Sequence, residues 1–134
     1  MSINLTDQDQ NTLRTAAYGA VTLMSYAGIA GSAHKVATDG SLALAAATGP
    51  TGHALADTKG LKIKGKSAAA LADEVLPALT ESVALLNAQD PAEAENFRRT
   101  VTIAVEAANR AHKGAPSPTM AEMTRKITEA LNAA

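Results

Sequence analysis

Apolar residues recur at helical spacing in three segments of the second half of the chain, at residues 67–89, 90–113 and 118–133. Steps of three and four residues place side chains on one face of a helix. The pattern predicts three amphipathic helices. Their apolar stripes are Ala72, Leu76, Leu79, Val83 and Leu86; Phe97, Val101, Ala104, Ala108 and Ala111; and Met120, Met123, Ile127 and Leu131.

Residues suited to helix ends mark several boundaries. Asp90 precedes Pro91, the order expected of a capping residue and a first helical residue. Thr6, followed by Asp9, predicts the start of an N-terminal helix, because a threonine hydroxyl can cap the first turn. Pro77 lies inside the segment 67–89 and predicts a kink or two abutting helices.

The first half of the chain is richer in glycine and alanine, and we expect helical segments over residues 6–31 and 32–58. The sequence Gly49-Pro50-Thr51-Gly52 predicts a break within the second of these, with a short helical piece after it. No segment of useful length alternates polar and apolar residues as a strand does. The sequence therefore predicts one all-α domain over residues 1–134, a bundle of four to five helices.

Composition adds a prediction about assembly. Nearly half of the 134 residues are apolar, but alanine dominates them, and the chain has one phenylalanine and no tryptophan. Alanine favours helix yet buries little area, so we expect alanine-rich packing, a marginal monomer and association with a second copy or another helical protein. The formal net charge of −1 argues against nucleic acid as a partner, and the lack of cysteine excludes thiolate chemistry.

Residues 60–67, GLKIKGKS, fit the phosphate-loop pattern G-x-x-x-x-G-K-[ST]. In such a loop Lys66 would meet the phosphates and Ser67 a magnesium ion. A phosphate loop follows a buried strand, however, and residues 53–59 are alanine-rich without a β-branched apolar residue. We interpret the match as chance, with Ser67 as a helix cap.

A weaker possibility is an anion site in the same segment. Four of the twelve basic residues fall within eight positions, immediately before a predicted helix N-terminus. Free backbone N–H groups and the helix dipole would add to their charge. This alternative assigns a small anionic or phosphate-bearing ligand to Lys59, Lys62, Lys64, Lys66 and Ser67.

Signatures of catalysis and of metal binding are lacking in the sequence. His53 and Asp57 stand four residues apart, but a metal needs three or more ligands. No G-x-S-x-G or H-E-x-x-H motif is present. We predict no cofactor and no metal site, and we favour a protein that is not an enzyme. An enzyme site assembled from His34, Asp39 and His53 is the third hypothesis.

Two spans, residues 15–33 and 40–56, carry no charged residue apart from His53 and resemble a membrane hairpin. They contain many small and polar residues, however, and are too weakly apolar for insertion. The start, MSINLTDQDQ, lacks the features of a secretory signal, and we expect a cytoplasmic protein. The leading functional hypothesis is a non-catalytic interaction module that associates with itself, with Met120 and Met123 as candidate contacts.

Overall fold

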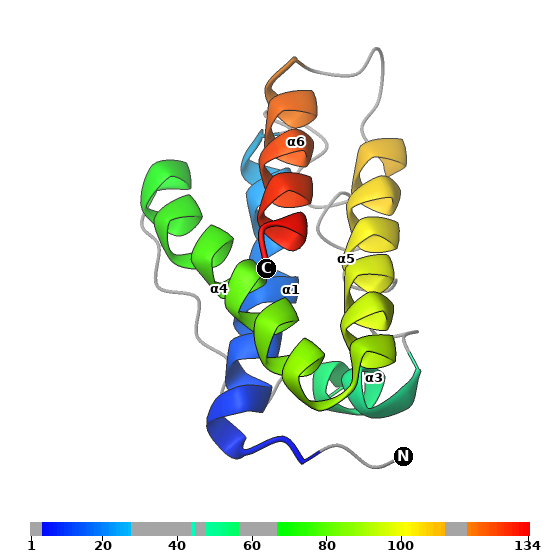
Figure 1. Ribbon diagram of the computed structural model, residues 1–134. Helices are drawn as coiled ribbons and strands as arrows, with labels where there is room; N and C mark the ends of the chain where they lie inside the picture. Colours follow the sequence, from blue (N-terminus) through cyan, green and yellow to red (C-terminus); the bar gives the residue numbers. More distant parts are fainter. Residues whose placement is uncertain (1–3, 28–43, 45–47, 57–66, 112–117) are drawn as a thin grey trace.

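The computed structural model describes residues 4–27, 44, 48–56, 67–111 and 118–134. This part of the chain contains no strand and five helices: α1 (Asp7–Ala27), α3 (Gly49–Ala56), α4 (Ala68–Gln89), α5 (Pro91–Ala111) and α6 (Pro118–Asn132). Figure 1 shows α1 and α5 running upward and α4 and α6 running downward, with α3 at the lower end of α5. The prediction of an all-α bundle is confirmed.

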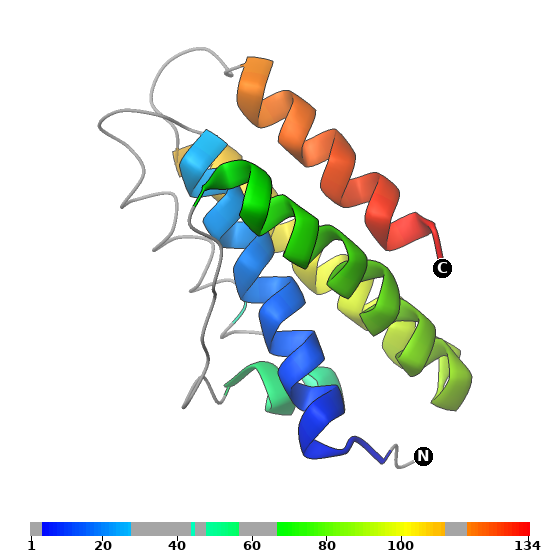
Figure 2. The same ribbon diagram turned by 90° about the vertical axis from the view of Figure 1, so that its left-hand side faces the viewer.

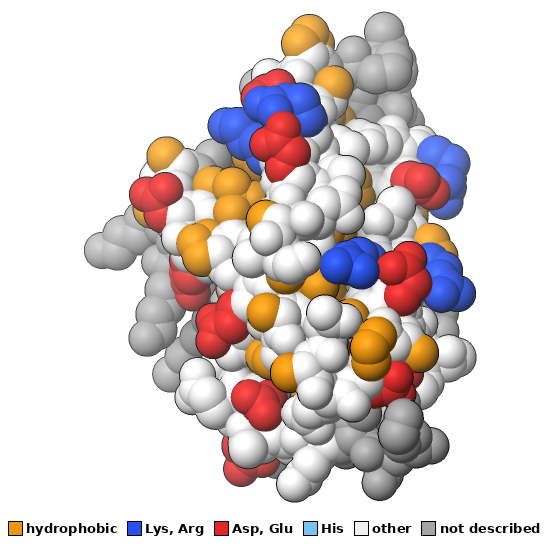
Figure 3. Space-filling model, viewed as in Figure 1, with side chains coloured by type: hydrophobic (Ala, Val, Ile, Leu, Met, Phe, Trp, Pro, Cys, Tyr) orange, Lys and Arg blue, Asp and Glu red, His pale blue; other side chains and the backbone are white. Residues whose placement is uncertain are grey.

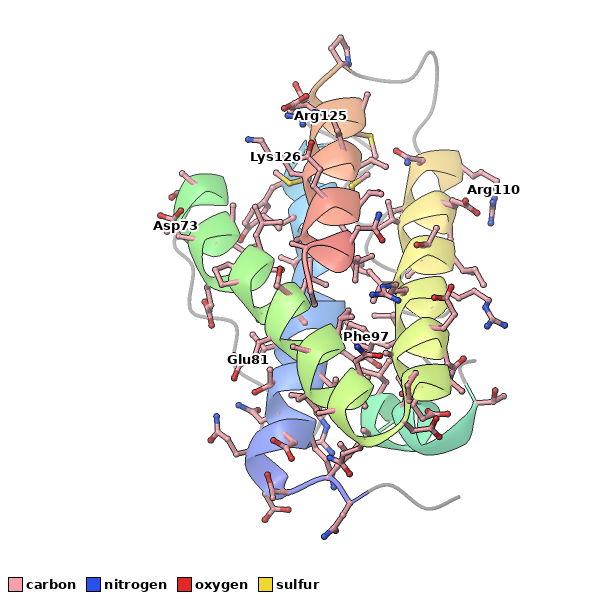
Figure 4. All side chains as sticks on the ribbon, in the orientation of Figure 1. Asp73, Glu81, Phe97, Arg110, Arg125 and Lys126 are labelled. Atoms are coloured by element: carbon pink, nitrogen blue, oxygen red, sulfur yellow. The ribbon has the colours of Figure 1, made fainter. Side chains whose placement is uncertain are left out.

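The helices share one apolar core. Phe97 on α5 is fully buried and points inward in Figure 4. Eight alanines from four helices, α1, α3, α5 and α6, are buried with it: Ala16, Ala17, Ala20, Ala54, Ala94, Ala104, Ala108 and Ala130. Leu44, described in isolation, is also buried in this core, whereas the remainder of the predicted helix up to residue 47 lies outside the described residues.

The apolar stripe predicted for α4 is correct in its second half and displaced in its first. Leu79, Val83 and Leu86 are fully buried as predicted. Toward the start of the helix, Leu71 and Val75 occupy the core, and the predicted Ala72 and Leu76 are only half-buried against it. Leu71 with Val75 and Ala72 with Leu76 are both four residues apart, as on one face of a helix. Which of the two pairs enters the core therefore depends on where the neighbouring helices lie.

A glycine brings α1 and α4 into close contact. A Cβ atom built on Gly19 would lie 2.4 Å from Cγ2 of Val75 and 3.2 Å from its Cγ1. Both methyl groups crowd the same space, and Val75 is fully buried, so rotation of its side chain cannot clear the site. The separation of α1 and α4 at this point therefore requires a residue without a side chain at position 19.

A buried hydroxyl of α4 lies against the backbone of α1 two helical turns further along. Ser82 donates to the carbonyl of Ala78 in its own helix at 2.7 Å, and its Oγ also lies 3.4 Å from the carbonyl oxygen of Thr12 of α1. Thr12 and Gly19 are seven residues apart on α1, and Val75 and Ser82 are seven apart on α4. These equal separations in opposite directions are those of an antiparallel pair, as Figure 2 shows for the two crossing helices.

Helix α4 continues through Pro77 as a single helix, so of the two expected alternatives, a kink or two abutting helices, the second is wrong. A proline in a helix removes one backbone donor and leaves the carbonyl four residues earlier without its usual partner. Here Pro77 and Asp73, the residue four positions before it, are both exposed. Water can solvate that carbonyl, which lowers the cost of continuing the helix.

The predicted break at residues 49–52 is instead the beginning of α3, and this expectation is corrected. Gly49 has φ of 75°, a backbone conformation suited to glycine, and Pro50 falls in the first turn, where no N–H donor is needed. Glu93 of α5 accepts hydrogen bonds from the backbone N–H of Thr51 at 3.2 Å and from its hydroxyl at 2.9 Å. A carboxylate from another helix thus caps α3.

The other end of α3 is held by α1. Arg14 donates through Nε to the carbonyl of Ala54 at 2.8 Å, and the Tyr18 hydroxyl donates to the carbonyl of Leu55 at 2.8 Å. A helix of eight residues is too short to be stable alone. Side chains of α5 and α1 therefore hold its two ends and fix it between these helices.

The end of α6 is satisfied in the same way. Thr80 of α4 donates to the carbonyl of Ala130 at 2.7 Å, and Arg98 of α5 donates to that of Leu131 at 3.1 Å. Carbonyl groups in the last turn of a helix lack partners within the helix. Residues from two other helices supply them here and fix α6 on the bundle.

Replacing Gly19 tests the close contact of α1 with α4. We expect Gly19→Ala to lower the free energy of unfolding by about 1–2 kcal/mol, since overpacking costs roughly 1–3 kcal/mol and the helix propensity of alanine returns up to about 1 kcal/mol. In a Val75→Ala background the same change should be close to neutral, because the obstructing methyl groups are gone. Urea unfolding followed by circular dichroism measures both. Equal losses in the two backgrounds would contradict the contact.

Alkaline pH tests the Tyr18 contact. Burial raises the Tyr18 pKa above the ordinary value of 10.0, although the charge of Arg14 opposes the rise. The unfolded chain therefore loses this proton first, and stability from the hydroxyl should be full below pH 10 and fall as pH rises toward the folded-state pKa. Tyrosinate absorbance in a Tyr26→Phe variant reports Tyr18 alone. The stability advantage over Tyr18→Phe, about 1 kcal/mol near neutrality, should shrink above pH 10; a constant difference would refute the assignment.

Candidate interaction surface

The residues proposed for anion binding are only partly placed. Lys59, Lys62, Lys64 and Lys66 lie outside the described residues. Ser67 is the N-cap of α4, and its Oγ accepts a hydrogen bond from the backbone N–H of Ala70 at 3.1 Å. This confirms the interpretation of Ser67 as a helix cap. The segment leading toward the loop is helix α3, where a phosphate loop would require a strand.

The side chains of the enzyme hypothesis lie outside the described part of the chain. His34 and Asp39 lie outside it, as does the side chain of His53. Across the described residues, no cluster of three or more histidine, cysteine, aspartate or glutamate side chains is arranged to hold a metal ion.

Two arginines, Arg98 and Arg125, pair with acidic residues within the described part of the chain. Arg98 bonds the end of α6 and pairs with Glu95 at 3.2 Å. Arg125 of α6 pairs with Glu122 and with Glu129, one turn to either side. Hydrogen bonding to Arg125 holds the pKa of Glu122 below its usual range. The charges along this part of α6 are therefore balanced within the helix.

The two candidate methionines also differ from the expectation of an exposed contact. Met120 is buried in the core at the start of α6, and Met123 is half-buried against it. Thr124, the next residue, accepts a hydrogen bond from Asn109 of α5 at 3.2 Å. This end of α6 therefore serves the packing of the bundle.

The outward face of α5 has a different character. Asp90 caps the helix by accepting a hydrogen bond from the backbone N–H of Ala92 at 3.0 Å, as the sequence predicts. The inward positions of α5, including Phe97 and Val101, fill the core. The opposite side bears a set of exposed residues, which we call the α5 outer face: Glu95, Arg99, Thr102, Ile103, Glu106 and Arg110.

Ile103 is the apolar member of this face and is 47% exposed. Among the described residues, the other large hydrophobic side chain this exposed is Tyr26, near the end of α1. Exposed single hydrophobic residues are common, but an isoleucine set among charges of both signs resembles the centre and rim of a small contact surface. Figure 3 shows the red and blue side chains along the right-hand margin, over α5.

The charges of the α5 outer face are arranged differently from those of the neighbouring helices. Arg99, Glu106 and Arg110 take part in none of the ion pairs found among the described residues. Helix α4 bears acidic but no basic side chains, with Asp73 and Glu81 exposed on it. Figure 4 shows Arg110 directed away from the bundle, and nothing in the described part of the chain covers this side of α5. The face is accessible to another molecule.

The sequence pattern predicted α5 from its apolar stripe alone and did not indicate a contact surface on its other side. The alternation of acidic and basic residues along the opposite side was a usable signal, because a helix with a clear inward stripe also defines which residues face outward.

Comparisons with protein-family models, with curated proteins and with solved structures find no match to this chain. None of the helices in the described segments combines the length and hydropathy needed to cross a lipid bilayer.

Two substitutions at Ser67 test its role as a cap. We expect Ser67→Ala to destabilise the protein by about 1 kcal/mol and Ser67→Asp to leave stability nearly unchanged, because aspartate caps helices as well as serine does. Urea unfolding with and without added inorganic phosphate measures both variants. Equal destabilisation by the two substitutions would contradict the capping role.

Proposed function

We propose that this protein is a non-catalytic interaction module that acts by associating with a second copy of itself. The observation that carries the proposal is the α5 outer face, where a half-exposed isoleucine lies among exposed charges of both signs. The inward side of the same helix is fully committed to the core, so the outer face is not needed for folding of the monomer.

The expected strength of such an association is modest. Burying the exposed part of one isoleucine side chain contributes about 1 kcal/mol per copy. Charged residues at the margin contribute little affinity but fix orientation and exclude wrong partners. An association of this kind suits a reversible module whose occupancy depends on protein concentration.

Support for the other two hypotheses is weaker. The anion-binding alternative depends on lysines outside the described residues, and its one placed member, Ser67, already caps α4. The enzyme alternative depends on three residues whose side chains are all outside them. Self-association is supported by residues whose positions and exposure are known.

Sedimentation equilibrium over a range of protein concentrations tests the proposal. Between about 1 µM and about 1 mM the mean mass should rise from the 13.6 kDa of one chain toward twice that value, as expected for a weak dimer. Native mass spectrometry of the purified protein checks for a co-purified small molecule. A mass of one chain at every concentration would refute self-association.

A further inference from the structure

We propose that α5 pairs with α5 of a second copy in antiparallel orientation, about a twofold axis that passes between Thr102 and Ile103. The inference rests on the self-association proposed above and names its surface and geometry. It follows from the order of charges along the α5 outer face. When a second copy of the helix runs in the opposite direction, each acidic residue of this face lies opposite a basic one.

The charged residues of this face lie symmetrically about one point of the helix. Thr102 and Ile103 stand midway between Arg99 and Glu106, and also midway between Glu95 and Arg110. Each of these two symmetric pairs joins an acidic with a basic residue. Reversing the helix about the midpoint therefore places opposite charges opposite one another.

The twofold pair brings these charges within reach. Two helices in contact lie 8–10 Å apart, and each residue advances about 1.5 Å along the axis. Arg99 then meets Glu106 of the partner subunit, and Arg110 meets Glu95 of the partner subunit. Because a twofold interface is isologous, each contact occurs twice. Ile103 of each copy lies beside the axis, where the two side chains cover one another.

The same charges oppose the alternative orientation of α5. In a parallel pair each residue faces its own copy, so Arg99 would meet a second arginine and Glu106 a second glutamate. Like charges that face one another are unfavourable. Charged residues at an interface therefore act mainly by excluding wrong orientations and wrong partners. The order of charges thus selects the antiparallel pair.

The other outward helices offer no comparable pairing of two copies in the described part of the chain. The exposed charges of α4 are acidic, including Asp73 and Glu81, which repel their own copies in either orientation. On α6, Arg125 is already shared between Glu122 and Glu129. Glu95 has a partner in Arg98 but remains exposed, and a carboxylate accepts several hydrogen bonds.

Charge reversal on each side of the axis tests the pairing. Arg99→Glu and Glu106→Arg each convert both Arg99–Glu106 contacts of the homodimer from attraction to repulsion. Each variant alone should associate at least about tenfold more weakly than the parent protein. An equimolar mixture of the two variants should form a heterodimer with affinity near the parent value, because Glu at position 99 then meets Arg at position 106.

Matched variants elsewhere control for net charge. Lys126→Glu on α6 and Glu81→Arg on α4 make the same charge changes at exposed positions off the α5 outer face, and both residues are labelled in Figure 4. Each should dimerise like the parent protein. A mixture of Arg99→Glu with Glu81→Arg has the same net charges as the rescuing mixture. Its heterodimer should nevertheless be weaker than the rescued one, because one of its two contacts between positions 99 and 106 stays repulsive.

The outcomes separate this inference from the proposed function. Sedimentation of the single variants and of the mixtures gives the dissociation constants, and circular dichroism checks that every variant keeps its helices. A parent protein that dimerises while Arg99→Glu and Glu106→Arg dimerise equally well would overturn the α5 pairing and leave self-association standing. A parent protein that stays a single chain overturns both. Failure of the rescuing mixture while each variant is weakened also contradicts the antiparallel geometry.

Discussion

The close contact between α1 and α4 is the constraint on which the rest of the bundle depends. Val75 occupies the space where any side chain at position 19 would begin, and Ser82 reaches the α1 backbone seven residues further along. Small residues let two helices approach closely but leave little hydrophobic area to stabilise the pair. Tight contact, extended along both helices, compensates for that small area and sets the positions from which the remaining helices pack.

Side chains that cap the ends of other helices provide a second level of organisation. Glu93 binds the start of α3, Arg14 and Tyr18 bind its end, and Arg98 binds the end of α6. Each contact satisfies a backbone group that a helix cannot satisfy for itself. Because the partners are distant in sequence, these bonds position helices as well as stabilise them, and they hold the short α3 in a helical conformation.

Helix α5 has two sides of different character. Phe97 and its inward neighbours form the core, while Arg99, Ile103 and Glu106 lie exposed on the outside. Substitutions on the outer side therefore leave the core contacts of α5 intact. In the self-association proposed above, charges of alternating sign around an apolar centre would favour one orientation of the partner.

The sequence by itself determined α1, α4, α5 and α6 and several of their ends, because apolar spacing and capping by Thr6, Ser67 and Asp90 act over a few residues. It also contained the symmetric charges of α5, although their exposure was not evident from spacing alone. Only the tertiary structure decided that Leu71 and Val75 face the core, that α3 begins at Gly49, and that α4 continues through Pro77. These features depend on the positions of other helices and on access to water, neither of which a local pattern specifies.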